Sequence, residues 1–208
     1  MLSTRRQLTA NMARPKSVPL PPVDFSSRTL PTETIAAGTR LVRIHRNDLE
    51  PLFFGASARN RFDDPLKSYG VCYFSMSVEG AFAETCLRAV GTRFVQLSFL
   101  EARAFSEFEV GKPIQLVSLH GPGLAQLGAT AAVSSGSHPP ARQWSRAIYD
   151  HPTAPDGIAY RSNHDNGELC VAMFERASAR LGAADSQPIM TDRRRLAALL
   201  ARYKVGLG

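Results

Sequence analysis

The amino-acid sequence predicts a single α+β domain. Short segments with alternating apolar and polar residues indicate strands, and others carry the three- and four-residue apolar spacing of helices. These segments do not follow the regular strand–helix–strand order of a parallel sheet, which favours an α+β arrangement. The chain has 208 residues, 44% of them hydrophobic and 21% charged. This composition excludes collagen, coiled coil and wholesale disorder, and the length allows a buried core without metals or disulfides.

The formal net charge of +7 is concentrated at the two ends of the chain. Residues 1–46 carry a net charge of +6 and residues 191–208 carry +4, whereas residues 47–190 carry −3. A basic face spread over the folded body is therefore not expected, which argues against direct nucleic-acid binding. One alternative stays open: a non-enzymatic module that binds nucleic acid or a partner through its basic termini, with Arg193, Arg194 and Arg195 as candidate phosphate contacts.

Residues 1–39 are interpreted as a basic, proline-rich N-terminal arm, draped over the domain or mobile. The arm has no apolar segment of the kind that marks a secretory signal. The sequence also has no run of about 18 apolar residues, so no membrane span is expected. Cys72, Cys86 and Cys170 lie in apolar surroundings without a paired spacing, which indicates reduced, buried thiols and a cytoplasmic protein.

Regular structure is expected to begin at residue 40, and a loop rich in Pro, Gly, Asn and Asp is expected over residues 48–70. Ser77 can cap the first long helix, and four apolar side chains at i, i+3, i+4 and i+7 define the last one. A further loop is expected over residues 129–137. Strands are predicted at 40–45, 71–75, 94–98, 114–118, 157–160 and 169–174, and helices at 77–89, 123–127, 140–149 and 191–205.

Common nucleotide, metal and hydrolase motifs are absent, and the five histidines show no metal-ligand spacing. Glu84 is a candidate because Gly80 and Ala81, one turn earlier, leave room for a ligand beside the helix. The alternative for Glu84 is a surface ion pair with Arg88, worth about 0.3–0.5 kcal/mol. Local alternatives also exist for the other three candidates: an exposed strand face for Arg43, a loop ion pair with Asp63 or Asp64 for Arg61, and a turn-capping hydroxyl for Ser162.

Five segments, taken together and in order, resemble the RES domain family: 41–46, 60–63, 69–73, 81–84 and 157–162. The resemblance covers roughly residues 41–176 and implies a RES-like catalytic domain over residues 40–208, with its C-terminal helix at 191–205. It also implies an ADP-ribosyltransferase-like fold, with a mixed or antiparallel sheet flanked by helices. The residues that it implies are catalytic Glu84, Arg43 and Ser162, and substrate-binding Arg61, Tyr73, Asn60 and Phe62; no metal is expected.

What the resemblance implies for function is an NAD⁺-degrading toxin of a toxin–antitoxin pair. NAD⁺ is then a substrate, with no separate cofactor, and a cognate antitoxin is the expected partner. The acceptor stays open: water gives a glycohydrolase, phosphate a phosphorylase, and a protein side chain an ADP-ribosyltransferase that modifies a host protein. The sequence departs from the family at two aromatic positions. Phe62 stands where a Trp is usual, and Ile44 follows Arg43 where an aromatic is often found.

The chemistry of these residue types fits cleavage between nicotinamide and ribose. Positive charge develops on the ribose as an oxocarbenium-like ion, which the Glu84 carboxylate can stabilise. Arg43 and Arg61 can clamp the pyrophosphate. Ser162 can orient Glu84 or the ribose, and Tyr73 can stack on an aromatic ring. Nicotinamide leaves as a neutral base, so the chemistry does not call for a strong general acid.

Overall fold

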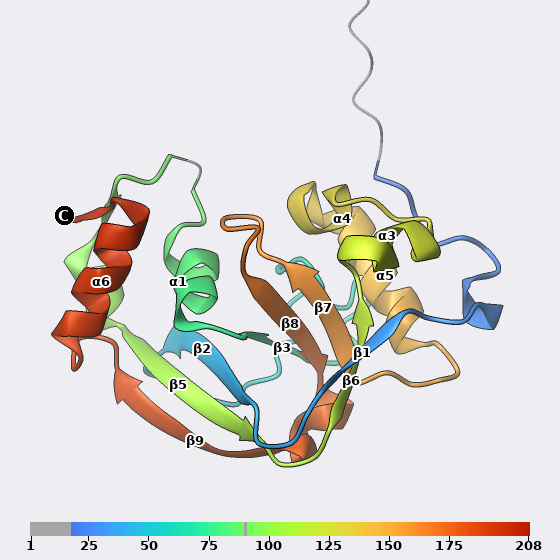
Figure 1. The fold of residues 1–208 in the computed structure, drawn as a ribbon, viewed down its shortest axis with the longest axis horizontal. Coiled ribbons are helices and arrows are strands. Elements are labelled where there is room, and N and C mark those ends of the chain that lie inside the picture. Colours follow the sequence, from blue (N-terminus) through green and yellow to red (C-terminus); the bar gives the residue numbers. More distant parts are fainter. Residues whose placement is uncertain (1–17, 90) are drawn as a thin grey trace, which may run out of the picture.

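The computed structural model describes residues 18–89 and 91–208, and its main feature is a curled, mixed sheet of eight strands (Figure 1). The strand order is β1-β6-β7-β8-β3-β2-β5-β9. Neighbouring strands are antiparallel except β6 and β7, which are parallel. The strands span Thr32–Ile35 (β1), Arg40–Arg46 (β2), Val71–Ser75 (β3), Arg103–Val110 (β5), Ile114–Ser118 (β6), Gly157–Arg161 (β7), Leu169–Phe174 (β8) and Leu181–Pro188 (β9).

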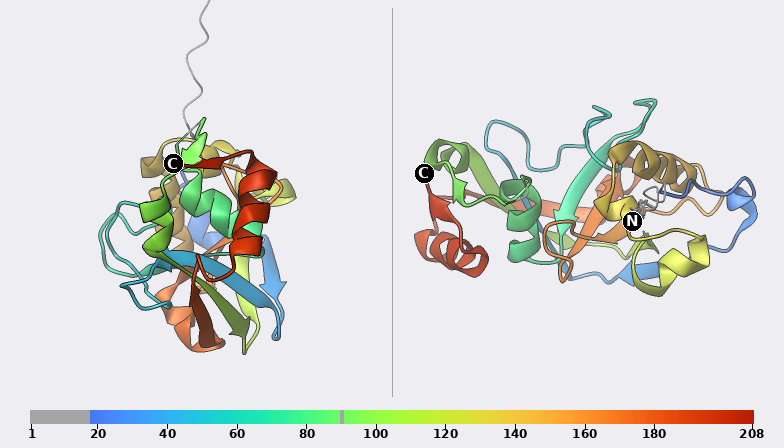
Figure 2. Two further views of the ribbon diagram at one scale, coloured as in Figure 1. Left: turned by 90° about the vertical axis from the view of Figure 1, so that its left-hand side faces the viewer. Right: turned by 90° about the horizontal axis from the view of Figure 1, so that it is seen from above.

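Six α-helices are described, and they gather over the two halves of this sheet. Figure 1 shows α1 and α6 above β2 and β5, and α3, α4 and α5 beside β6 and β7. From above, α6 lies at one end of the molecule, the helices of the other half lie at the opposite end, and α1 lies between (Figure 2). The helices are Val78–Cys86 (α1), Leu97–Glu101 (α2), Gly121–Leu127 (α3), Ala132–Ser135 (α4), His138–Tyr149 (α5) and Arg193–Tyr203 (α6). Short elements complete the fold: 3₁₀ helices at Phe25–Ser27 and Glu175–Arg180, and the parallel pair β4 (Phe94–Val95) and β10 (Gly206–Leu207).

The sheet is almost divided between β2 and β3. These two strands share a single residue pair, Val42 opposite Ser75. By contrast, β2 pairs with β5 over its whole length and β3 pairs with β8 over all five of its residues. The two halves therefore diverge on either side of this one contact, and α1 packs close to the point where they part.

The apolar core has three parts that follow this division. One part packs α5 against β6–β8 around Trp144, and another covers the sheet around Phe74 and Phe108. The third part joins α1 and α6 to β2 and β5 around Phe82 and Leu196. Each large, fully buried apolar side chain contributes about 1.5–3 kcal/mol of stability. The three free cysteines are all buried, as expected.

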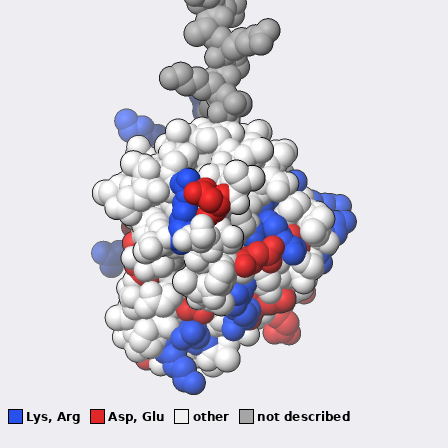
Figure 3. Space-filling model, turned by 90° about the vertical axis from the view of Figure 1, so that its right-hand side faces the viewer, with Lys and Arg blue, Asp and Glu red and all other residues white. Residues whose placement is uncertain are grey.

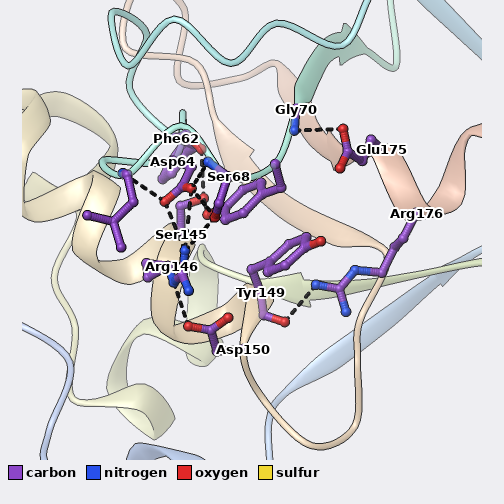
Figure 4. A network of polar contacts seen from close by, with 12 residues as sticks. Phe62, Asp64, Ser68, Gly70, Ser145, Arg146, Tyr149, Asp150, Glu175 and Arg176 are labelled. Atoms are coloured by element: carbon purple, nitrogen blue, oxygen red, sulfur yellow. Dashed lines mark hydrogen bonds and ion pairs between the residues drawn. The ribbon is translucent and has the colours of Figure 1, made fainter.

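A polar network fixes the second half of the loop between β2 and β3 (Figure 4). The Asp64 carboxylate accepts hydrogen bonds from the Ser68 amide at 2.5 Å and the Ser68 hydroxyl at 2.6 Å, and lies 3.4 Å from the Arg146 guanidinium. Ser145 donates to the Phe62 carbonyl at 2.6 Å. Because Ser145 and Arg146 belong to α5, this loop without regular structure is attached to the core.

The α+β prediction is confirmed, and five of the six predicted strands and all four predicted helices are present. Ser77 caps α1 by accepting from the Gly80 amide at 3.0 Å, and Asp192 caps α6 by accepting from the Arg195 amide. No helix in the described part of the chain is long and apolar enough to cross a membrane.

Several boundaries were predicted wrongly. The predicted strand 94–98 contains only the two residues of β4 before α2 begins, and the loop at 129–137 contains α4. Strands β5 and β9 were not predicted. Strand β9 is an edge strand with a largely exposed, polar sequence, so it lacks the apolar alternation that marks a strand.

Regular structure also begins before residue 40. Strand β1, within the expected N-terminal arm, pairs with β6 at the sheet edge. The Pro19 carbonyl accepts from the Trp144 indole at 2.8 Å, and the Pro31 carbonyl accepts from the Ser118 amide at 2.8 Å. Residues 18–39 are therefore held along the domain, while residues 1–17 of the expected arm lie outside the described residues.

We expect His45 to make the fold sensitive to acid. Burial lowers its pKa, and the charges of Arg43 and Arg103 add to that effect. The ring bonds the Arg46 carbonyl and the Ser106 hydroxyl, both at 2.7 Å. Because its folded-state pKa lies below the unfolded value of about 6.5, the unfolded chain binds more protons, and stability is lost as pH falls through about 6.5.

Urea unfolding at pH 7.5 and pH 5.5 measures this effect. His45→Gln should reduce the difference in unfolding free energy between the two pH values, whatever its effect at pH 7.5. An unchanged difference would show that other groups cause the acid sensitivity.

Candidate active site

A cavity of about 500 Å³ lies where β2 and β3 diverge. Its walls come from β2, β3, α1, the loop at residues 60–61, the start of α5, the end of β7 and the segment that follows β7. Five of the residues singled out from the sequence line it: Arg43, Asn60, Arg61, Tyr73 and Glu84. These residues are up to 41 positions apart, so the divided sheet and α1 bring them together.

Ser162 adjoins the cavity through Glu84. Its hydroxyl lies 2.6 Å from Glu84 Oε1 and also accepts from the amides of His164 at 3.1 Å and Asp165 at 3.2 Å. Because two amide hydrogens occupy the lone pairs of the oxygen, its own hydrogen is directed to the Glu84 carboxylate. Ser162 is only 2% exposed. It is therefore placed to hold Glu84 in one orientation rather than to attack a substrate.

The surface ion pair considered for Glu84 is not formed. The Arg88 guanidinium donates to the backbone carbonyl of Glu84 at 2.9 Å and makes no ion pair with its carboxylate. Among the described residues, the Ser162 hydroxyl is the hydrogen-bond donor to that carboxylate. Glu84 is half-buried and faces the cavity, so its carboxylate is available to a ligand there.

Helix α1 reaches this position because Gly80 lets it approach β3. A Cβ at residue 80 would lie 2.1 Å from Ser75 Oγ and 3.1 Å from Glu168 Cβ. The sequence interpretation that Gly80 and Ala81 both leave open space was thus half wrong. Ala81 lines the cavity, whereas the space beside Gly80 is already occupied by Ser75 of β3.

Arg61 presents its positive charge to the cavity without a carboxylate partner in residues 18–89 and 91–208. Its guanidinium donates to the carbonyl of Gly136 at 2.6 Å and to that of Val133 at 3.4 Å. Burial lowers the pKa of Arg61, and the nearby Glu84 charge opposes that shift. The predicted alternative, an ion pair with Asp63 or Asp64, is not formed. The charge is therefore held by carbonyls and can meet an anionic ligand.

Asp63 instead organises the loop that carries Arg61. Its buried carboxylate accepts from the backbone amides of Arg59 at 3.1 Å and Asn60 at 3.0 Å, and from the Tyr73 hydroxyl at 2.9 Å. Burial, followed by the Asp63 charge, raises the pKa of Tyr73 well above its usual value. Tyr73 therefore stays a neutral donor that ties the loop to β3. From the sequence, Asp63 was predicted only as an ion-pair candidate, although an Asp three residues after Asn60 in a loop is a typical turn signal.

Phe62 does not line the cavity, in contrast to its assignment as a substrate-binding residue. It is fully buried, and its ring packs against Tyr160 with 4.8 Å between centroids. Its amide donates to the Tyr73 hydroxyl at 2.9 Å. The loop turns between residues 61 and 62, so Arg61 faces the cavity while Phe62 enters the core and supports Tyr160, which is a lining residue.

Arg43 spans the gap between the two halves of the sheet. Its guanidinium donates to the Phe53 carbonyl at 3.2 Å and to the Cys72 sulfur on β3. Leu41 and His45, which share its strand face, are buried, so the alternative of an exposed face is wrong. Burial raises the pKa of the Cys72 thiol to about 11, partly offset by the Arg43 charge, so the sulfur is a neutral neighbour.

Comparison with known proteins identifies the family. A family model for the RES domain matches residues 40–196, which is about three quarters of the chain. The chain belongs to the RES domain family. It is 33% identical over 122 residues to the "Probable toxin y4kH" of Sinorhizobium fredii (strain NBRC 101917 / NGR234), a match that covers 57% of this chain and 95% of that protein.

A solved structure shares the fold. This RES domain superposes with a TM-score of 0.61 on a chain of the crystal structure of the M. tuberculosis MbcT–MbcA toxin–antitoxin complex. The match covers 79% of this chain and 92% of that one, at 15% sequence identity. At that identity the likeness establishes the fold.

Several residues of the RES domain cavity were not predicted from the sequence. They are Thr85, Arg88, His138, Tyr160, Asn163 and His164. The His138 ring lies 3.1 Å from the Arg59 carbonyl, an acceptor, which places a hydrogen on Nδ1. Burial lowers the pKa of His138, with further lowering by Arg61 and Arg142. Residue type alone does not distinguish such a histidine from one on an ordinary surface.

Gly80→Ala should destabilise the protein by about 1–3 kcal/mol, the usual cost of overpacking. The sign of this change in stability is informative, because Gly→Ala in a helix with open space beside it stabilises the protein by about 0.5–1 kcal/mol. Urea unfolding measures the difference. The double variant Gly80→Ala/Ser75→Ala should recover part of the loss, because the closest clashing atom is gone. A Gly80→Ala protein more stable than the parent would contradict the close packing of α1 on β3.

Proposed function

We propose that this RES domain is a toxin that destroys NAD⁺ by cleaving the bond between nicotinamide and ribose. The observation that carries the proposal is the Glu84 carboxylate, oriented by Ser162 at 2.6 Å in a cavity that also presents Arg61 and Arg43. The toxin role is supported by the two relatives, the "Probable toxin y4kH" and the toxin–antitoxin complex.

Glu84 supplies the electrostatic part of the reaction. As the bond to nicotinamide lengthens, positive charge grows on the ribose, and a fixed carboxylate stabilises it more than it stabilises the substrate. The Ser162 hydrogen bond keeps the carboxylate in place before the charge develops, so little reorganisation is needed during the reaction. Nicotinamide departs as a neutral base, which no group on the protein has to protonate.

The two arginines fit the anionic part of NAD⁺. The pyrophosphate carries two negative charges, and guanidinium groups bind such oxygens with paired, charge-assisted hydrogen bonds. The Arg61 guanidinium donates to backbone carbonyls, which are neutral acceptors. Charged phosphate oxygens are stronger acceptors and can replace them when the substrate binds. A cavity of about 500 Å³ also falls in the common range of about 300–1,000 Å³ for small-molecule sites.

A cognate antitoxin is part of the proposal, supported by the structural neighbour, which comes from a toxin–antitoxin complex. The competing hypothesis of binding through basic termini is weakened at Arg195, whose guanidinium pairs with Asp192 at 3.3 Å and with Glu107 at 3.6 Å. On the face opposite α6, basic and acidic side chains are interspersed among uncharged ones, and the described residues form no continuous basic surface there (Figure 3). The arginines that the structure places in a cavity are better suited to a small anionic substrate.

Nicotinamide release from NAD⁺ tests the function. The wild-type protein should release nicotinamide, and Glu84→Gln should lower kcat at least about 100-fold, the scale for losing one preorganised electrostatic group. Glu101→Gln is the matched control, because Glu101 is exposed on α2, outside the cavity lining. It should retain wild-type turnover. Full turnover by a folded Glu84→Gln protein would refute the assignment.

The same assay identifies the acceptor. Product analysis with and without inorganic phosphate separates free ADP-ribose, the product with water, from its phosphorylated counterpart. NAD⁺ labelled on the adenine side would instead leave its label on protein if a side chain were the acceptor. No nicotinamide release under any of these conditions would refute the proposed function itself.

A further inference from the structure

The C-terminal helix contacts the segment that carries Ser162. Family similarity ends at residue 196, within α6, so the last turns of this helix lie beyond the matched region. These turns nevertheless reach the connection between β7 and β8, residues 162–168, referred to below as the serine loop. The contacts come from Arg202 and Tyr203.

Tyr203 joins three parts of the protein. Its hydroxyl lies 3.0 Å from Asp165 Oδ2 in the serine loop and 3.1 Å from the Glu79 carbonyl on α1, and its single hydrogen is shared between these acceptors. Its ring stacks on Phe82 of α1, with 5.9 Å between centroids and 13° between planes. The hydroxyl is therefore held by the packing of the ring and connects the serine loop to the helix that carries Glu84.

Arg202 reinforces this attachment. Its guanidinium lies 3.2 Å from Glu168 Oε1 and 3.6 Å from Asp165 Oδ2. The other oxygen of Glu168 accepts from the hydroxyl of Ser77, the N-cap of α1. The Arg202 side chain is 52% exposed, so its ion pairs are screened by solvent and contribute less than the half-buried tyrosine.

The two residues of the serine loop that Tyr203 and Arg202 contact, Asp165 and Glu168, are also the ones that orient Ser162. The Asp165 amide donates to Ser162 Oγ at 3.2 Å, and the Ser162 amide donates to the Glu168 carbonyl at 3.1 Å. If Asp165 moved, one lone pair of the serine oxygen would lose its amide donor, and the hydroxyl hydrogen could turn away from Glu84. The position of the serine loop thus decides whether the Ser162–Glu84 hydrogen bond persists.

We propose that Tyr203 is a positioning residue, which holds the serine loop against α1 and so keeps Ser162 aligned with Glu84. The catalytic consequence rests on the function proposed above, whereas the structural consequence does not. Since the Ser162–Glu84 bond serves the charge that develops during reaction, loss of the Tyr203 hydroxyl affects kcat more than KM.

Tyr203→Phe tests the proposal because it retains the stacked ring and removes the hydroxyl alone. Amide hydrogen exchange should become faster in residues 162–168, and kcat for nicotinamide release should fall about three- to tenfold, as expected for one lost hydrogen bond, with KM changed less than about twofold. Tyr149→Phe is the matched control. It removes a tyrosine hydroxyl on α5, outside the cavity lining, and should change neither quantity.

A second pair of variants tests the contribution of the Arg202 charge. Arg202→Gln should accelerate exchange in the serine loop to a smaller extent than Tyr203→Phe, and Arg202→Lys should restore part of the protection because it keeps the charge. Thermal unfolding of each variant verifies that the global fold is intact.

The outcomes separate this proposal from the proposed function. Unchanged exchange in residues 162–168 of Tyr203→Phe would overturn the positioning role, whatever the activity. Faster exchange with an unchanged kcat would also overturn it, since the loop would then be released without effect on the site. If the wild-type protein released no nicotinamide, the function would fail, and the exchange data alone would then decide whether Tyr203 holds the loop.

Discussion

The narrow join between β2 and β3 is the constraint on which the rest of this structure depends. A continuous sheet would pair these strands along their length and leave no space between them. Here only Val42 and Ser75 are paired, so the halves diverge and a cavity forms at the gap. Helix α1 can pack at this place because Gly80 has no side chain to clash with Ser75. The helix then directs Glu84 into the cavity.

The site combines one carboxylate with several cations, and each is held by neutral groups. Ser162 orients Glu84, and backbone carbonyls hold Arg61 and Arg43. Two buried carboxylates of the loop do not neutralise these arginines: Asp63 is saturated by amides and the Tyr73 hydroxyl, and Asp64 is bonded by Ser68 and Arg146. Charges held in this way are preorganised and remain available to a ligand, which is what electrostatic catalysis requires.

Local signals account for what sequence analysis predicted well. Apolar alternation revealed the interior strands except β5, and the predicted cap Ser77 lies at the start of α1. The missed edge strands lack such a signal. Strands β1 and β9 lie at the two edges of the sheet, where half or more of each strand meets solvent and the apolar pattern is weak. Phe62 was misassigned because the direction of a loop side chain depends on the core that receives it.

The sequence by itself determined the fold class, the long loop before β3, and the residue types that bring the chain into the RES family. It could also place Glu84, Arg43 and Arg61 as candidates. Only the tertiary structure decided which alternative each residue adopts: Glu84 bonds Ser162 and not Arg88, and Arg61 avoids the neighbouring aspartates. The physical reason is that these choices depend on partners more than 70 residues away, such as Gly136 and Ser162, whose positions arise from packing and not from local pattern.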